Sequence, residues 1–181
     1  MAQTRQTIQN FYTQSQSKDF ARTNLFRVLN VDFGDGSDQA FDEDDLVYAT
    51  TVSLPGKEIT TNTVPYMGLN FNVPGVAKYP GSSDYNLRFR CDENYNLRDR
   101  FLSVLEDTFD DQDSTGNYFI PNANAVIDLA LLDKELNRVG QFQLVGIAPR
   151  SVGDIQYDVT SDGPIVEFDI KVSYHFFRKT G

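Results

Sequence analysis

The stretch VEFDIKVSYHF, residues 166–176, decides the fold class because apolar and polar side chains alternate along its whole length. The apolar set is Val166, Phe168, Ile170, Val172, Tyr174 and Phe176, and the polar set is Glu167, Asp169, Lys171, Ser173 and His175. Successive side chains of a β-strand point to opposite faces. The stretch therefore predicts one long strand, from Ile165 to Phe177, with a dry face and a polar face.

Segments outside this stretch predict further strands joined by turns. Val139 to Ala148 reads as a strand, Pro149 marks a corner, and Ser161-Asp162-Gly163-Pro164 has the composition of a turn. Breaks are predicted at residues 35–38, at Pro55-Gly56 and over a loop at residues 74–83. The other predicted strands are residues 24–33, 46–54, 85–91 and 125–132, together with the Thr-rich, weakly charged segment 58–73.

One helix is expected inside this set of strands. Its apolar residues recur at helical spacing and are Leu97, Phe101, Val104, Leu105 and Phe109. Asn94 or Asn96 is the predicted N-cap. The fold class is therefore mainly β (α+β), an antiparallel β-barrel or sandwich of about seven strands with one packed α-helix. We assign residues 1–18 to an N-terminal arm and residues 19–181 to a single domain.

The arm is polar but carries Ile8, Phe11 and Tyr12 at i, i+3, i+4 spacing. This spacing is compatible with one or two helical turns that pack on another subunit. A frayed terminus is the equally weighted alternative.

Composition restricts the function. With 26 acidic and 16 basic residues the net charge is −10, which disfavours binding to nucleic-acid phosphates. No apolar run approaches about 18 residues, so membrane insertion is not expected, and residues 1–17 lack a signal-peptide core, so the chain is expected to be made and kept in the cytoplasm. His175 and Cys91 are single residues of their kinds, so neither a nucleophile–His triad nor a zinc cluster can be named, and we expect neither enzymatic activity nor a cofactor.

One acidic loop has partial calcium-loop spacing. Asp111, Asp113 and Thr115 stand at ligand spacing before Gly116, but Asn122 replaces the closing Glu and Pro121 opposes an exit helix. An acidic turn that ends the helix is the favoured interpretation, and a calcium site the weaker one.

Three motifs, in order along the chain, resemble one known family. They are DFARTNLFRV at residues 19–28, Leu54-Pro55-Gly56 followed by Val64-Pro65 and Met67, and GIAPRSVGDI at residues 146–155. The last is similar to a G-x-x-P-x-x-V-G-acidic-aliphatic stretch of the tail tube proteins of contractile-tailed bacteriophages. The resemblance spans residues 19–177, with a loose middle.

The resemblance implies a structural subunit of the inner tail tube, with residues 19–181 forming the tube β-barrel domain. Such subunits form hexameric rings that stack into a channel for genome passage, inside a tail sheath and together with baseplate and tape-measure proteins. The implied location is the virion, and DNA passes without specific binding. The segment 58–73 corresponds to an extended hairpin that helps to join subunits in that family.

We predict inter-subunit contacts at Thr60, Thr61, Thr63, Met67, Arg88, Arg90 and Phe11, and lumen-facing side chains at Asp128, Glu167 and Asp169. The loop 34–45 and the arm are predicted to contact the next ring. Acidic side chains on a channel wall would repel DNA phosphates.

Three alternatives stay open at this point. A baseplate tube initiator and the tube protein of a secretion system or phage-tail-like particle share the family's motifs. The third alternative, from another class, is an acidic β-sandwich module that binds carbohydrate or protein as a monomer.

Overall fold

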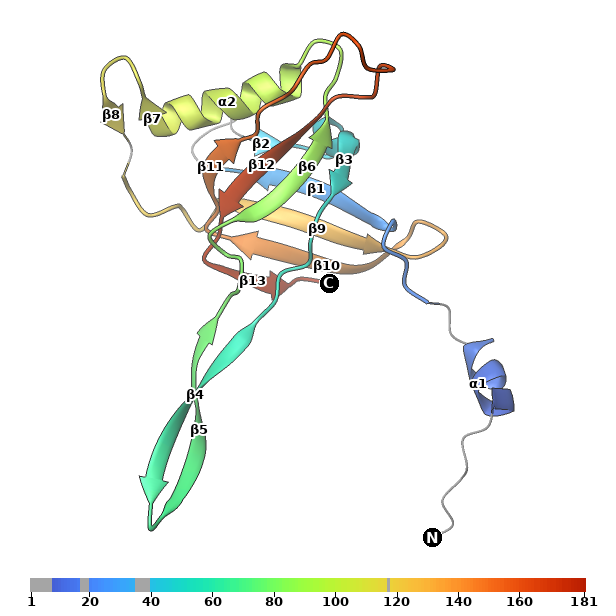
Figure 1. Ribbon diagram of the computed structural model, residues 1–181, viewed down its shortest axis with the longest axis vertical. Helices are drawn as coiled ribbons and strands as arrows, with labels where there is room; N and C mark the ends of the chain where they lie inside the picture. Colours follow the sequence, from blue (N-terminus) through green and yellow to red (C-terminus); the bar gives the residue numbers. More distant parts are fainter. Residues whose placement is uncertain (1–7, 17–19, 35–39, 117) are drawn as a thin grey trace.

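The computed structural model describes residues 8–16, 20–34, 40–116 and 118–181. Its body is a sandwich of two antiparallel sheets (Figure 1). Sheet A has the order β13-β10-β9-β1-β2 and sheet B the order β11-β12-β6-β3. The prediction of a mainly β, antiparallel fold is confirmed, and both sheets of the described chain are open rather than closed into a barrel.

Seven strands of the described chain are six residues or longer. They are β1 (Phe26–Asp32), β4 (Glu58–Tyr66), β5 (Leu69–Lys78), β6 (Tyr85–Arg90), β9 (Val126–Leu132), β10 (Arg138–Val145) and β12 (Glu167–Ser173). The shorter strands are β2 (Ala40–Phe41), β3 (Ala49–Thr51), β7 (Phe109–Asp110), β8 (Thr115–Gly116), β11 (Ala148–Val152) and β13 (Phe176–Lys179).

The alternating residues of both sheets fill the space between them. Leu87 and Phe89 of β6 and Phe168 and Ile170 of β12 are buried from one side, and Ile127 of β9 from the other. Neighbouring strand residues point to solvent because side chains alternate across a strand. Burying a large apolar side chain stabilises the fold by roughly 1.5–3 kcal/mol, so this core holds the body together.

The predicted helix is present as α2 (Asn96–Thr108) and closes one end of the sandwich (Figure 1). Leu97, Phe101 and Val104 are its buried residues. The Phe101 ring stacks on Phe41 with 4.0 Å between ring centroids. The predicted cap is wrong: Tyr95 is the N-cap residue, and the Asp92 carboxylate accepts the backbone N–H of Asn96 at 3.2 Å. Asp92 lies one turn earlier, where its side chain reaches an otherwise unpaired helix donor.

The predicted single strand from Ile165 to Phe177 is wrong, because the chain changes sheets within it. The described strand β12 belongs to sheet B and β13 to sheet A. After Tyr174 the backbone N–H of His175 donates to the carbonyl of Val145 at 3.0 Å. The crossing resets the alternation, so Phe176 is 42% exposed while Phe177 packs on the core.

The corner predicted at Pro149 lies three residues earlier. Gly146, with φ of +71°, turns the chain from β10 in sheet A toward β11 in sheet B, and Pro149 lies inside β11. A Cβ on Gly146 would come within 2.3 Å of His175 Nδ1. The two sheet crossings are therefore packed against each other, which explains why a glycine opens the 146–155 motif.

Two predicted boundaries also differ. The predicted strand 46–54 begins as a 3₁₀ helix, η2 (Asp45–Tyr48), followed by β3. The reason is a turn in which the carboxylate of Asp42 accepts the backbone N–H groups of Asp44 and Asp45 at 3.2 and 3.3 Å. The predicted loop 74–83 starts only after Lys78, because Pro74 and Gly75 are tolerated in a two-stranded hairpin with a bulge between Ile59 and Thr61. The turn predicted at 35–38 lies outside the described residues.

Two segments project from the body (Figure 1). One is the β4–β5 hairpin, and the other is the arm with helix α1 (Ile8–Ser15), none of whose residues is buried. None of the helices among the described residues is long and apolar enough to span a membrane.

Candidate assembly surfaces

The β4–β5 hairpin has one apolar face and one polar face. Register pairs Tyr66 with Leu69, Val64 with Phe71 and Asn62 with Val73. The five apolar members of this face are each 46–63% exposed in the isolated chain. We call Val64, Tyr66, Leu69, Phe71 and Val73 the hairpin apolar face. A lone two-stranded hairpin is marginally stable in water, so such a face requires a partner surface.

The hairpin ends in a tight turn at Met67 and Gly68, with φ of +49° and +77°. Positive φ at both central residues is the geometry that suits a two-residue hairpin connection. Met67, a predicted contact residue, is 85% exposed at this tip. Its flexible thioether can adapt to an irregular surface.

The predicted threonine contacts lie away from the hairpin apolar face. Thr61 and Thr63 share the other face with Asn70 and Asn72, and the Thr63 hydroxyl lies 3.2 Å from Asn72 Oδ1. Thr60 sits at the bulge, where its Oγ1 accepts the backbone N–H of Val76 at 2.9 Å. The alternation of Leu69, Phe71 and Val73 along the sequence was the signal for the apolar face.

The outer face of sheet B carries two cross-strand ion pairs. Arg88 lies opposite Asp169 in register, and its Nε and Nη2 donate to the two carboxylate oxygens at 2.7 and 3.0 Å. Arg90 lies opposite Glu167, with Nε and Oε1 3.7 Å apart. Hydrogen bonds from Arg88 lower the pKa of the Asp169 carboxyl and raise the pKa of the Arg88 guanidinium. The structure thus brings two predicted contact residues and two predicted lumen residues together on one face.

The outer face of sheet A carries a row of polar side chains across four strands. Register aligns Asn30 of β1, Asp128 of β9, Gln143 of β10 and Arg178 of β13. Gln143 Nε2 donates to Asp128 Oδ1 at 3.0 Å, and Arg178 Nε donates to Gln143 Oε1 at 2.8 Å. We call these four residues the amide row. Asp128 therefore lies on the opposite outer face from Glu167 and Asp169, so the three predicted lumen carboxylates do not share one surface.

Sheet A also leaves strand edges open. In the described structure β13 has one paired neighbour, β10, and β2 pairs only with Val31 and Asp32 of β1. Open edges present backbone donors and acceptors that another chain can pair with. The acidic segment after β2 is bound back to the body, because the Glu43 carboxylate bridges Arg27 and Arg138.

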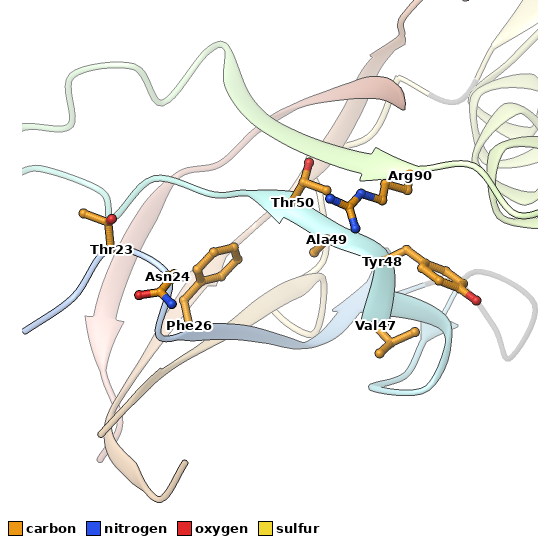
Figure 2. Close-up of a pocket in the computed structure, with 8 residues that line it drawn as sticks. All are labelled: Thr23, Asn24, Phe26, Val47, Tyr48, Ala49, Thr50 and Arg90. Carbon is orange, nitrogen blue, oxygen red and sulfur yellow. The ribbon is translucent and has the colours of Figure 1, made fainter. Parts of the chain in front are cut away.

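A groove of about 470 Å³ lies between the two sheets, where the start of β1 faces β3 and the end of β6 (Figure 2). Figure 2 shows the Phe26 ring between β1 and β3, with the Arg90 side chain reaching from β6 toward Thr50. The lining combines apolar, hydroxyl and amide side chains, with Arg90 as its charged member.

The predicted calcium loop folds as a turn between β7 and β8. The Asp110 carboxylate accepts the backbone N–H groups of Gln112 and Asp113 at 2.7 and 3.2 Å. Asp111 and Asp113 therefore lie within an aspartate turn, and Thr115 is the first residue of β8. Throughout the described ranges, no three His, Cys, Asp or Glu side chains are placed to hold a metal ion.

Three solved structures resemble this chain over nearly its whole length. A chain of the anti-feeding prophage baseplate, 6-fold symmetrised, has a TM-score of 0.63 at 16% identity and covers 91% of this chain and 97% of its own. A chain of the sheath–tube complex of the extracellular contractile injection system PVC in its extended state has a TM-score of 0.52 at 14% identity, with 93% and 96% covered. A chain of the PVC sheath/tube terminator has 0.54 at 12% identity, with 91% and 99% covered.

No known protein-family profile and no curated protein matches the sequence. The structural matches show that the chain has a tail-tube-like fold, as the three motifs predicted.

Proposed function

We propose that this protein is the structural subunit of the inner tube of a contractile phage tail, assembled as stacked hexameric rings. Support comes from a fold shared with parts of contractile injection particles, one of them a six-fold baseplate. The tail sheath, baseplate and tape-measure proteins are the proposed partners. The tube performs no bond chemistry and belongs to the virion.

The hairpin apolar face carries the proposal. Its five large side chains are exposed on a hairpin that projects from the body, and no charged residue occurs between residues 59 and 77. An uncharged, apolar projection of this kind is costly in a soluble monomer and stabilising in an assembly. A second copy of the chain is the partner that a tube subunit meets at every position.

Sheet A is the proposed channel wall. Its four main strands β1, β9, β10 and β13 alternate in direction, so β13 of one copy would meet β1 of the next in antiparallel sense. Joining the open edges around a ring would satisfy them. The amide row would then line the channel with one carboxylate and one guanidinium per copy, a polar and nearly neutral wall that lets DNA pass without binding.

Charge sets a condition on assembly. Six copies of net charge −10 give a ring of about −60, so like-charge repulsion opposes ring formation at low salt. Added salt screens this repulsion, so we expect it to promote assembly up to the ionic strength at which the surface charges are fully screened.

Negative-stain electron microscopy of the purified protein tests the proposal. Hollow tubes or six-fold rings are expected, with more of them at higher protein and salt concentration. Phe71→Ala should abolish them, whereas the matched control Asn72→Ala, on the other hairpin face, should retain them. Monomers at every concentration, also after addition of a preformed baseplate, would contradict the proposal and favour a monomeric binding module.

A baseplate tube initiator is the second candidate, favoured by the baseplate match with a TM-score of 0.63. The two roles differ in elongation. A tube subunit should extend into filaments of many rings when its concentration rises, whereas an initiator should stop at one ring. A tube of an injection or secretion particle would show the same elongation but no DNA in the lumen of purified particles.

A further inference from the structure

The N-terminal helix α1 stands away from the body with an apolar stripe exposed (Figure 1). Ile8, Phe11 and Tyr12 form the stripe and are 62–76% exposed. Isolated helices shorter than about 12–15 residues are marginal in water. An eight-residue helix with this stripe therefore depends on a surface that covers it.

A cleft with suitable lining lies at the root of the arm. It has a volume of about 390 Å³ and lies where the root, residues 21–26, meets β9 and the segment between β3 and β4. Its apolar lining includes Leu25, Phe26, Val52, Leu54 and Leu131. Leu54 is exposed although it belongs to this otherwise apolar lining. Arg22 is the charged residue of the lining.

Phe26 lines both this cleft and the groove in Figure 2, which also shows Thr23 and Asn24 of the arm root beside β1. The cleft thus opens on the side of the sandwich where sheet A also leaves its β1 edge largely unpaired. Apolar surface that joins an open strand edge is typical of a contact between chains rather than of a monomer surface.

Charge favours contact between the arm and a second body. Residues 1–18 contain Arg5 and Lys18 and no acidic residue, a net charge of +2. The other residues carry 14 basic and 26 acidic side chains, a net charge of −12. Two whole chains repel each other, whereas an arm is attracted to the body of its neighbour.

We propose that helix α1 of one copy docks its Ile8–Phe11–Tyr12 stripe into the cleft at the arm root of a second copy. The inference rests on the proposed assembly and adds to it which segment reaches the next subunit and where that segment is received. The arm and the cleft are different surfaces, so the contact can pass in one direction from copy to copy, as in a ring or a stack. This head-to-tail form is the one proposed, whereas two copies that exchanged arms would close at a dimer.

Disulfide trapping tests this contact in a chain whose native Cys91 is replaced (Cys91→Ala). The double variant Phe11→Cys and Leu54→Cys should give a ladder of dimers, trimers and larger species on non-reducing gels. Docking brings the two thiols to an effective concentration of about the millimolar range, and a disulfide requires Cα atoms within roughly 7 Å. The matched control Thr13→Cys with Leu54→Cys, on the opposite helix face, should give far less cross-linking.

Mixing two single-cysteine variants shows whether the arm docks on its own body or on a second copy. Single-cysteine Phe11→Cys protein mixed with single-cysteine Leu54→Cys protein should form one heterodimer and no longer ladder. Loss of both thiols in the double variant without dimers would show that the arm occupies its own cleft and would overturn the proposal. Equal cross-linking from Phe11 and Thr13 would overturn it as well.

Electron microscopy of the same variants under reducing conditions separates this inference from the proposed function. Rings or tubes without arm cross-links would leave the proposed function supported and refute the docking site. Arm cross-links in a protein that forms no ring or tube would support the docking contact and contradict the tube assignment.

Discussion

Phe89 of strand β6 in the sandwich and Phe71 of strand β5 in the hairpin are both phenylalanines inside a strand, but their surroundings differ completely. Phe89 is fully buried against Phe168 of β12 and Phe101 of α2, while Phe71 is 50% exposed on a ribbon that projects from the body. The body covers its apolar side chains within one chain. The hairpin has a similar alternating pattern, but no other part of the chain covers its apolar side chains. The same pattern can therefore encode an interface as well as a core.

The sharpest test of this comparison is a pair of matched truncations. Phe89→Ala should lower the free energy of unfolding of the isolated chain by about 3–5 kcal/mol, because it removes contacts and leaves a cavity. Phe71→Ala should change it by less than about 0.5 kcal/mol. Urea unfolding of the monomer measures both values. A large loss for Phe71→Ala would mean that the hairpin belongs to the cooperative body.

The second test concerns the two places, at Gly146 and His175, where the chain crosses between sheet A and sheet B. Left-handed backbone costs a residue with a Cβ roughly 1–2 kcal/mol. Gly81→Ala, at φ of +75° with open space around it, should cost about that much. Gly146→Ala should cost more than about 2 kcal/mol, because its Cβ would also displace the His175 ring.

Thermal and urea unfolding compare the two glycine variants. His175→Ala combined with Gly146→Ala should recover the part of the loss that comes from the collision. If Gly81→Ala and Gly146→Ala cost the same, the crossings are not packed against each other as described.

The smallest effect is expected on the outer face of sheet B. The Arg88 guanidinium holds the pKa of the Asp169 carboxyl below its usual range. A lowered folded-state pKa adds stability above the unfolded pKa of about 4, and this stability is lost as the pH falls through the folded value. Both side chains are partly exposed, so solvent screening keeps the contribution small.

Unfolding of wild type and Asp169→Asn in a pH series from neutral to acid checks this prediction. The wild type should be slightly more stable at neutral pH, and the difference should shrink below pH of about 4. Arg88→Lys keeps the charge but not the two parallel hydrogen bonds, so it should lose part of the difference. A stability difference between wild type and Asp169→Asn that does not depend on pH would contradict the lowered pKa of Asp169 as its cause.

Sequence periodicity predicted the elements of the body well and the assembly surfaces only in part. The alternation at residues 85–91 and the helical spacing from Leu97 to Leu105 correspond to β6 and α2. Phe109, which was predicted to belong to the helix, lies just past its end in β7. The hairpin was anticipated from its family resemblance, and its predicted contact residues are Thr60, Thr61, Thr63 and Met67. Of these, Thr61 and Thr63 lie on the hairpin face opposite the apolar one. The pairing of Val64 with Phe71 and of Tyr66 with Leu69, which defines the apolar face, depends on register across two strands.

The sheet faces show the same limit. Asp128, Glu167 and Asp169 all occupy polar positions in alternating strands, and alternation alone cannot say which outer face each one reaches. Pairing places Asp128 beside Gln143 on sheet A and Asp169 beside Arg88 on sheet B.

Local sequence patterns were enough to identify most of the strand segments, the position of the one packed helix, and the acidic surface. These properties depend on neighbours along the chain, whose periodicity sets which side chains share a face. The change of sheets at Gly146 and at His175, and the uncovered hairpin apolar face, became visible only in the folded chain. Those features depend on contacts between residues far apart in sequence, and no local pattern specifies which distant surface a strand will meet.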